Sequence, residues 1–164
     1  MPFQVLPLDV QHDRKQFSCG TPALDNYFQS QVSQDVKRRV ASCFVALAAD
    51  DSVAGFYTLA ATSVALTDLP APNAKTLPRY PLVPAVRMGR LAVSSAHQGL
   101  GLGAALLANA LQRAANADIA AYAFVVDAKD DQAAKFYAHH GFISLPDAAL
   151  TLFLPLGSVA TLVK

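Results

Sequence analysis

The sequence has no glutamate, only two cysteines and no long apolar run, and each absence narrows the classes of protein that fit. All twelve acidic residues are aspartate. Cys19 and Cys43 are too few for a disulfide framework and lack the spacing of metal ligands, so we expect a reduced, cytoplasmic setting. The longest stretch without charge, 91–112, contains polar residues and three glycines and is a poor membrane span. The first ten residues do not have the form of a signal peptide.

The length and composition predict one folded domain. The chain has 164 residues, of which 53% are hydrophobic and 15% charged, and this balance excludes intrinsic disorder. A chain of this size buries enough surface for a proper core. The sequence shows no internal repeat and no low-complexity segment. We therefore expect a single domain spanning residues 1–164.

The charges are unevenly distributed along the chain, although the net charge is only +1. No acidic residue occurs between Asp68 and Asp118, so this middle stretch carries +5 and the remainder −4. The basic residues of the stretch are Lys75, Arg79, Arg87, Arg90 and Arg113. This segregation indicates an anionic ligand bound near the middle of the chain, or else a chance drift of surface charge.

Hydrophobic patterning predicts strands that alternate with helices. The predicted strands are the start of 1–17, then 40–48, 53–61, 85–93, 119–127, 142–145 and 149–154. The predicted helices are 21–36, where the Thr21 hydroxyl caps a helix beginning at Pro22, then 102–115 and 130–139. Residues 66–84 hold five of the ten prolines and form a long loop or short helical turns. The order predicts an α/β fold with a single mixed central sheet flanked by helices.

A glycine-rich segment joins the predicted strand 85–93 to the predicted helix 102–115. Gln98 is followed by glycines at positions 99, 101 and 103. Glycines let a backbone approach a ligand closely, and the amides at a helix start favour a phosphate group. Three alternating glycines each lower helix propensity by about 1 kcal/mol, so a turn without a ligand is the less favoured alternative.

Two other phosphate-binding motifs are excluded by their context. Gly99, Gly101 and Ala104 fit the dinucleotide pattern, and Asp127 stands where a ribose-binding acid would. Too few residues follow Asp127, however, for the remaining strands of that fold. The pattern of the nucleotide-hydrolase P-loop does not occur in the sequence.

The glycine segment resembles the pyrophosphate motif of the GNAT superfamily of acetyl-CoA-dependent N-acetyltransferases. A second GNAT motif is matched by the segment from Asp130 to Phe142, although its first position is usually Asn. Three further segments, 17–27, 89–93 and 126–130, resemble the toxin branch, whose members acetylate the amino group of aminoacyl-tRNA and block translation. The resemblance covers residues 3–155 and implies a GNAT fold throughout.

The resemblance also implies how acetyl-CoA is bound. The backbone of Leu91, Ala92 and Val93 would pair with the pantetheine arm. The pyrophosphate would lie against the amides of Gln98, Gly99, Leu100, Gly101, Leu102, Gly103 and Ala104. The second motif would add contacts from Asp130, Ala133 and Phe136. Arg87, Arg90 and Arg113 remain equal candidates for the 3′-phosphate.

Tyr137 is the catalytic candidate by its position in the second motif. A phenol can protonate, or donate a hydrogen bond to, the thiolate that leaves the thioester. The alternative is that the ring only packs in the core. With no glutamate available as a general base, the sequence mildly favours an acceptor of low pKa, such as an α-amine, which is about 20% neutral near pH 7.4.

The toxin resemblance further implies partners for this chain. These are tRNA, a ribbon-helix-helix antitoxin and a second copy in a homodimer. The basic residues expected to contact tRNA are Lys37, Arg38, Arg39, Arg79 and Arg90. Two alternatives stay open: a metabolic or protein N-acetyltransferase, and a non-catalytic CoA-binding regulator. We expect no membrane association. We also expect no metal, because the adjacent His139 and His140 point apart on a helix.

Overall fold

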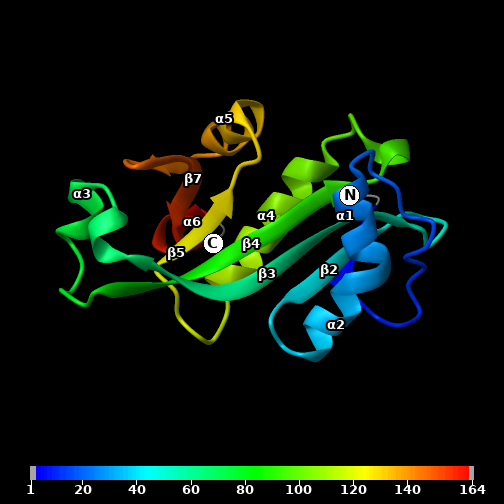
Figure 1. The fold of residues 1–164 in the computed structure, drawn as a ribbon, viewed down its shortest axis with the longest axis horizontal. Helices are drawn as coiled ribbons and strands as arrows, with labels where there is room; N and C mark the ends of the chain where they lie inside the picture. The colour runs from blue at the N-terminus through cyan, green and yellow to red at the C-terminus, as the bar shows by residue number, and fades with distance from the viewer. Residues whose placement is uncertain (1–2, 163–164) are drawn as a thin grey trace. The chain divides into compact units, whose positions relative to one another are not determined.

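The computed structural model describes residues 3–162, in which seven strands form one mixed sheet (Figure 1). The strands are Gln4–Pro7 (β1), Ser42–Leu47 (β2), Val53–Ala65 (β3), Leu82–Val93 (β4), Ala123–Asp127 (β5), Ile143–Leu145 (β6) and Ala148–Pro155 (β7). Their order in the sheet is β1-β2-β3-β4-β5-β7-β6. Strands β4 and β5 are parallel, while β1–β2, β2–β3, β5–β7 and β6–β7 are antiparallel. The predicted α/β fold with one mixed sheet is confirmed.

Six α-helices accompany the sheet in the described residues. They are Pro22–Asn26 (α1), Val32–Lys37 (α2), Ala71–Ala74 (α3), Leu102–Ala115 (α4), Asp131–His139 (α5) and Leu156–Leu162 (α6). Helix α4 has the bounds that the sequence predicts, because glycines precede it and a polar loop follows it. Helix α6 was not predicted.

The predicted helix 21–36 differs from the observed structure in two respects. A π-helical turn, Tyr27–Gln31, separates α1 from α2 and lets two consecutive residues, Tyr27 and Phe28, both be buried. The prediction that the Thr21 hydroxyl caps the helix is wrong, since Thr21 makes no side-chain cap. Instead the carboxylate of Asp25 reaches back and accepts the N–H of Cys19 at 2.8 Å.

The residues divide into two compact units, which are described here separately. The first unit comprises the chain up to Ala60 together with Gly89–Ala110, and the second comprises Ala61–Met88 and the chain from Leu111 onward. The single domain expected from the sequence stays a prediction.

The core of the first unit is built on three phenylalanines. Phe28 stacks on Phe56 with 4.3 Å between ring centroids, and Phe17 meets both rings edge-on. Strand β3 approaches the start of α4 closely, because a Cβ at Gly55 would lie 2.8 Å from both the Ala92 carbonyl oxygen and a methyl of Leu106. Glycine at position 55 therefore lets the first turns of α4 pack directly on the sheet.

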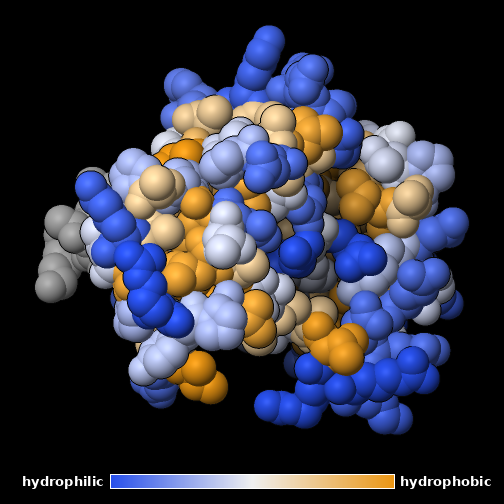
Figure 2. Space-filling view, turned by 60° about the vertical axis from the view of Figure 1, so that its left-hand side comes forward, coloured by the Kyte–Doolittle hydropathy of each residue, from blue (hydrophilic) through white to orange (hydrophobic). Residues whose placement is uncertain are grey.

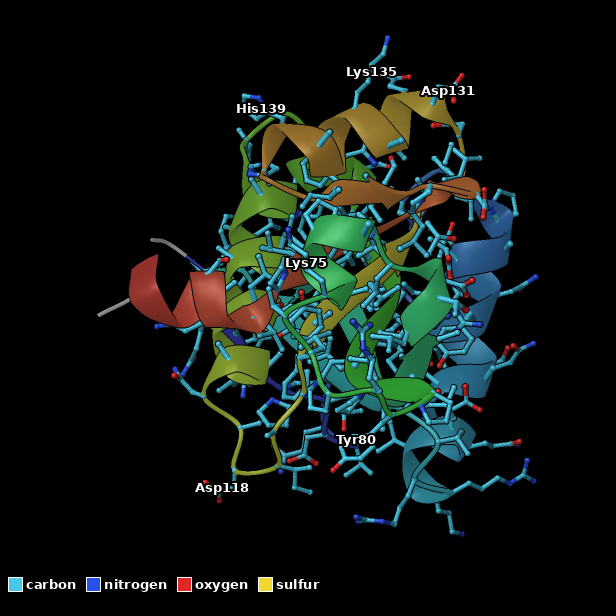
Figure 3. The ribbon with its side chains drawn as sticks, turned by 90° about the vertical axis from the view of Figure 1, so that its left-hand side faces the viewer. Lys75, Tyr80, Asp118, Asp131, Lys135 and His139 are labelled. Carbon is cyan, nitrogen blue, oxygen red and sulfur yellow. The ribbon has the colours of Figure 1, made fainter. Side chains whose placement is uncertain are left out.

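The core of the second unit surrounds Phe153 of β7, with side chains of β3, β4 and β5 and of the loop 66–69. Helix α5 packs on β7 and is amphipathic. Figure 3 shows Asp131, Lys135 and His139 on its outer side, one helical turn apart, whereas Tyr137 is buried.

The surface carries no large continuous apolar area on the face drawn in Figure 2, where hydrophobic side chains form separate groups among hydrophilic ones. None of the helices in residues 3–162 is long and apolar enough to span a membrane.

Candidate functional site

The turn between β4 and α4 has a backbone shape that requires glycine. Gly99 and Gly101 both have φ of +80°, a conformation that side chains with a Cβ rarely adopt. A Cβ at either position would meet no atom of the described residues within 4 Å. The turn is therefore strained for other residues by its dihedral angles and not by crowding, and its outer side is open.

Gly103, in contrast, is not required by the protein's own packing. It lies in the first turn of α4 without a positive φ, and a Cβ there would make only an ordinary contact of 3.9 Å with a methyl of Val93. Alanine at this position would favour the helix by about 1 kcal/mol. The packing of the described residues therefore does not explain why glycine stands at position 103.

The side chain of Gln98 fixes this turn to two other segments. Its Nε2 donates to the carbonyl oxygens of Cys19 at 2.9 Å and of Val93 at 3.1 Å. Ser95 N also donates to Ser18 O at 2.8 Å. The N-terminal segment 17–27, which carries part of the sequence resemblance, therefore supports the turn. Gln98 serves through its side chain as a structural anchor, and the backbone amides that follow it are the candidate ligand contacts.

The last residues of β4 present backbone groups on alternating edges. Ser94 N donates to Ala54 O of β3 at 2.8 Å. Because successive strand residues direct their backbone groups to opposite edges, Ala92 also faces β3, whereas Leu91 and Val93 face away from it. Of the three residues predicted to pair with pantetheine, Leu91 and Val93 are the two whose N–H groups point to the other edge.

These features fit a bound acetyl-CoA. Helix α4 is 14 residues long, so the partial positive charge at its N-terminus is well developed. Leu100 is 66% exposed at the tip of the turn, and Leu102 anchors the helix start in the core. Ala104 is half-buried in the first turn.

Within the described residues no group of three or more His, Cys or Asp side chains could hold a metal ion.

In the second unit, Asp130 is the N-cap of α5. Its Oδ1 accepts the N–H of Ala133 at 2.8 Å, so aspartate performs here the capping that asparagine also performs. Phe136 is half-buried and contacts the rings of Tyr137 and His140. Asp130, Ala133 and Phe136 thus lie together on one helix with Tyr137.

Tyr137 is packed through its ring against neighbouring aromatic side chains. The side chain is 9% exposed and its ring tilts against Phe142 with 5.6 Å between centroids. No hydrogen bond of the described residues involves the Tyr137 hydroxyl. Burial raises the pKa of Tyr137 to about 12. The hydroxyl therefore stays protonated, as a hydrogen-bond donor must.

The candidate arginines differ in their surroundings. Arg87 forms an ion pair with Asp127, which also accepts the Thr151 hydroxyl at 2.9 Å, so this guanidinium is already engaged. The guanidinium of Arg90 lies 3.5 Å from the centroid of the Tyr27 ring. This pairing is not predictable from the sequence, because Tyr27 and Arg90 are far apart in the chain.

The remaining basic residues predicted to bind tRNA are exposed. Lys37 ends α2, and Arg38 and Arg39 follow it, with Arg39 at a φ of +62°. Arg79 lies in the loop between α3 and β4, next to Tyr80, which Figure 3 shows at the edge of the second unit. None of these side chains is needed for the core.

Two curated proteins are similar to this chain over almost its whole length. The tRNA-acetylating toxin of Mycobacterium tuberculosis is 36% identical over 153 residues, which cover 92% of this chain and 90% of that protein. The probable toxin TacT of Sinorhizobium fredii is 31% identical over 168 residues, covering 95% and 92%.

Solved structures with the same fold include complexes of AtaT. AtaT complexed with acetyl-methionyl-tRNAfMet is 28% identical, with a TM-score of 0.90 over 99% of both chains. AtaTR bound with acetyl-CoA is 26% identical, with a TM-score of 0.85 and the same coverage. The AtaT–AtaR complex bound to DNA is 26% identical, with a TM-score of 0.78 over 98% of this chain and 99% of that one. The family model for acetyltransferases of the GNAT family matches residues 11–142, and the chain therefore belongs to this family of N-acetyltransferases.

Proposed function

We propose that this N-acetyltransferase transfers the acetyl group of acetyl-CoA to the α-amino group of an aminoacyl-tRNA, and so acts as a toxin that blocks translation. The observation that carries the proposal is the open glycine turn at the start of α4, in a chain that is 36% identical to a tRNA-acetylating toxin over nine-tenths of both proteins. The AtaT complexes with acetyl-CoA and with acetyl-methionyl-tRNA support the same substrate pair.

The first unit would hold the acetyl donor. The amides from Gln98 to Ala104 would bind the pyrophosphate at the positive end of α4, and the N–H groups of Leu91 and Val93 would pair with the pantetheine arm. Acetyl-CoA supplies an activated thioester whose C–S bond breaks when an amine attacks the carbonyl carbon. Because the protein itself fixes the turn, its amides are oriented before the donor arrives.

Tyr137 would stabilise the departing thiolate by a hydrogen bond. Its pKa of about 12 lies far above the value of about 8.5 for a thiol, so complete proton transfer from the phenol to the sulfur is unfavourable. A neutral hydroxyl that donates a hydrogen bond as negative charge develops on sulfur lowers the barrier without losing its proton. The proton that the thiol finally carries then comes from solvent or from the acceptor nitrogen, which loses a proton after the neutral amine has attacked and the amide forms.

The acceptor would be bound by cationic side chains that lie outside the core. Lys37, Arg38, Arg39, Arg79 and Arg90 are the residues we assign to tRNA, because phosphate contacts from lysine and arginine supply most of the affinity for nucleic acid. We also propose that the protein works in the cytoplasm, where its substrates occur, as a homodimer, and that a ribbon-helix-helix antitoxin masks it. The AtaT–AtaR complex on DNA supports the antitoxin.

The direct test of this function is acetyl transfer from labelled acetyl-CoA. We expect charged tRNA to be acetylated at its α-amine, with far lower turnover on free amino acids, polyamines and peptide amines. Expression of the protein alone should arrest bacterial growth, and a Tyr137→Phe variant should not. Efficient acetylation of free amines with none on charged tRNA would instead identify a metabolic or protein N-acetyltransferase. Tight CoA binding without transfer to any amine would identify a regulator.

Replacement of Tyr137 by phenylalanine should remove catalysis while leaving the fold intact. The ring packing against Phe142 is kept and only the hydroxyl is lost, so we expect kcat to fall at least ~100-fold with an unchanged Michaelis constant for acetyl-CoA. Steady-state kinetics and thermal unfolding measure both effects. Tyr122→Phe, on β5's entry loop, is the matched control and should keep the wild-type kcat. Wild-type turnover by Tyr137→Phe would exclude the hydroxyl from the reaction.

Replacement of Gly103 by alanine should move stability and donor binding in opposite directions. The free energy of unfolding should rise by about 0.5–1 kcal/mol, because alanine favours the helix. The affinity for acetyl-CoA should fall at least tenfold, since the new Cβ occupies the space where the pyrophosphate approaches. Chemical denaturation and calorimetry measure the two quantities. Ala108→Gly, exposed on the same helix, should show the reverse, with lower stability and unchanged affinity. Undiminished affinity in Gly103→Ala would contradict the placement of the phosphates.

The pH dependence of the reaction should follow the acceptor and not Tyr137. Burial disfavours the phenolate, so the pKa of Tyr137 is raised to about 12 and the hydroxyl remains protonated across the measurable range. The rate with charged tRNA should therefore rise through the α-amine pKa near ~8 and then stay level to about pH 9.5. Initial rates between pH 6.5 and 9.5 test this. A decline above pH 8.5 that depends on Tyr137 would contradict it.

A further inference from the structure

Arg90 is held in a fixed orientation by the ring of Tyr27. The guanidinium carbon lies 3.5 Å from the ring centroid, which is the distance of a stacked cation–π contact. The backbone of Arg90 is fixed as well, because its N–H donates to Thr58 Oγ1 at 3.1 Å and Thr58 is buried. The backbone and the guanidinium of Arg90 are therefore both restrained within the first unit.

Tyr27 is itself held in place by burial and by a hydrogen bond to α2. It lies in the π-helical turn, is only 4% exposed, and its hydroxyl donates to Asp35 Oδ2 of α2 at 2.8 Å. Burial, reinforced by the hydrogen bond to Asp35, raises the pKa of Tyr27 above its usual range, so this hydroxyl remains a donor. The π-helical turn thus serves to place one rigid aromatic face under Arg90.

The guanidinium donors of Arg90 have no acceptor among residues 3–162. The ion pairs and hydrogen bonds of the described residues include none from its guanidinium, although the side chain is half-buried. Arg87 provides the contrast, since its guanidinium is neutralised by Asp127. An arginine that is stacked, restrained and without an acceptor presents a fork of N–H groups that matches a phosphate.

We propose that Arg90 binds a phosphate group of a substrate and that Tyr27, anchored by Asp35, is the positioning residue that orients it. The inference rests on the proposed function, because a phosphate on this side chain can come from the tRNA backbone or from the 3′-phosphate of CoA. Both sources share the same oxyanion chemistry, and they are separable by which substrate loses affinity. Among the arginines that the sequence left as equal candidates, the geometry favours Arg90 over Arg87.

The test compares four variants of the full chain: Arg90→Gln, Arg90→Lys, Tyr27→Leu and Tyr27→Phe. Michaelis constants are measured for charged tRNA and for acetyl-CoA separately, with kcat and the melting temperature. Arg90→Gln should raise one of the two constants about tenfold and leave kcat near wild type. Arg90→Lys should recover only part of this loss, because lysine neither stacks nor forks. Lys15→Gln, an exposed charge in the same unit, is the control and should change neither constant.

The two Tyr27 variants distinguish a role in positioning Arg90 from a role in stability alone. Tyr27→Leu should raise the same Michaelis constant as Arg90→Gln, by about fivefold, because the stacking face is lost. Tyr27→Phe keeps the ring and should restore most of the affinity, although both variants lose the bond to Asp35. If Tyr27→Phe and Tyr27→Leu are equally impaired, or if only the melting temperature changes, Tyr27 is structural and the proposal is overturned.

The two possible sources of the phosphate give different results. A raised constant for charged tRNA alone, with the slope of log Kd against log salt reduced by ~0.7–0.9, places an RNA phosphate on Arg90. A raised constant for acetyl-CoA alone places the 3′-phosphate there. If neither constant changes in Arg90→Gln, Arg90 binds no phosphate. If wild-type protein fails to acetylate charged tRNA, the proposed function is lost, while the acetyl-CoA measurement still decides the remaining source.

Discussion

The proposed donor site depends on the hydrogen bonds by which the Gln98 side chain fixes the turn between β4 and α4. The Gln98 side-chain amide donates to the carbonyl oxygens of both Cys19 and Val93. It therefore links the N-terminal segment, the end of β4 and the turn to one another. These hydrogen bonds hold the turn in which Gly99 and Gly101 take a φ of +80°. A phosphate site shaped by the protein needs little rearrangement on binding, and this favours affinity.

The elements that the sequence predicts well are those determined by local chemistry. The bounds of α4 and the β2–β3 hairpin follow from glycine placement, polar turns and periodicity. The glycine motif was also placed correctly between a strand and a helix. What periodicity does not resolve is the π-helical turn, because Tyr27 and Phe28 are both buried only by virtue of one extra residue in that turn. The burial of both Tyr27 and Phe28 depends on packing against the aromatic core, which a local sequence pattern does not encode.

Contacts between distant segments decide the functional detail, and these lie beyond sequence reasoning. Sequence alone leaves Arg87 and Arg90 equivalent, whereas the fold pairs one with Asp127 and lays the other on Tyr27. The Thr21 side chain makes no cap, whereas the Asp25 carboxylate in the first turn of the same helix accepts the N–H of Cys19.

The structural roles of the aspartates limit which side chains could serve as a general base in acetyl transfer. Asp127 accepts hydrogen bonds from Arg87 and Thr151, and Asp130 caps α5, so these two carboxylates have structural roles. Without glutamate, the groups that could deprotonate an amine are the other aspartates, the histidines or water. An acceptor that is already partly neutral at working pH removes the need for a base. The protein would then have to stabilise only the leaving thiolate, and we propose that Tyr137, whose pKa is raised by burial, does this by remaining protonated.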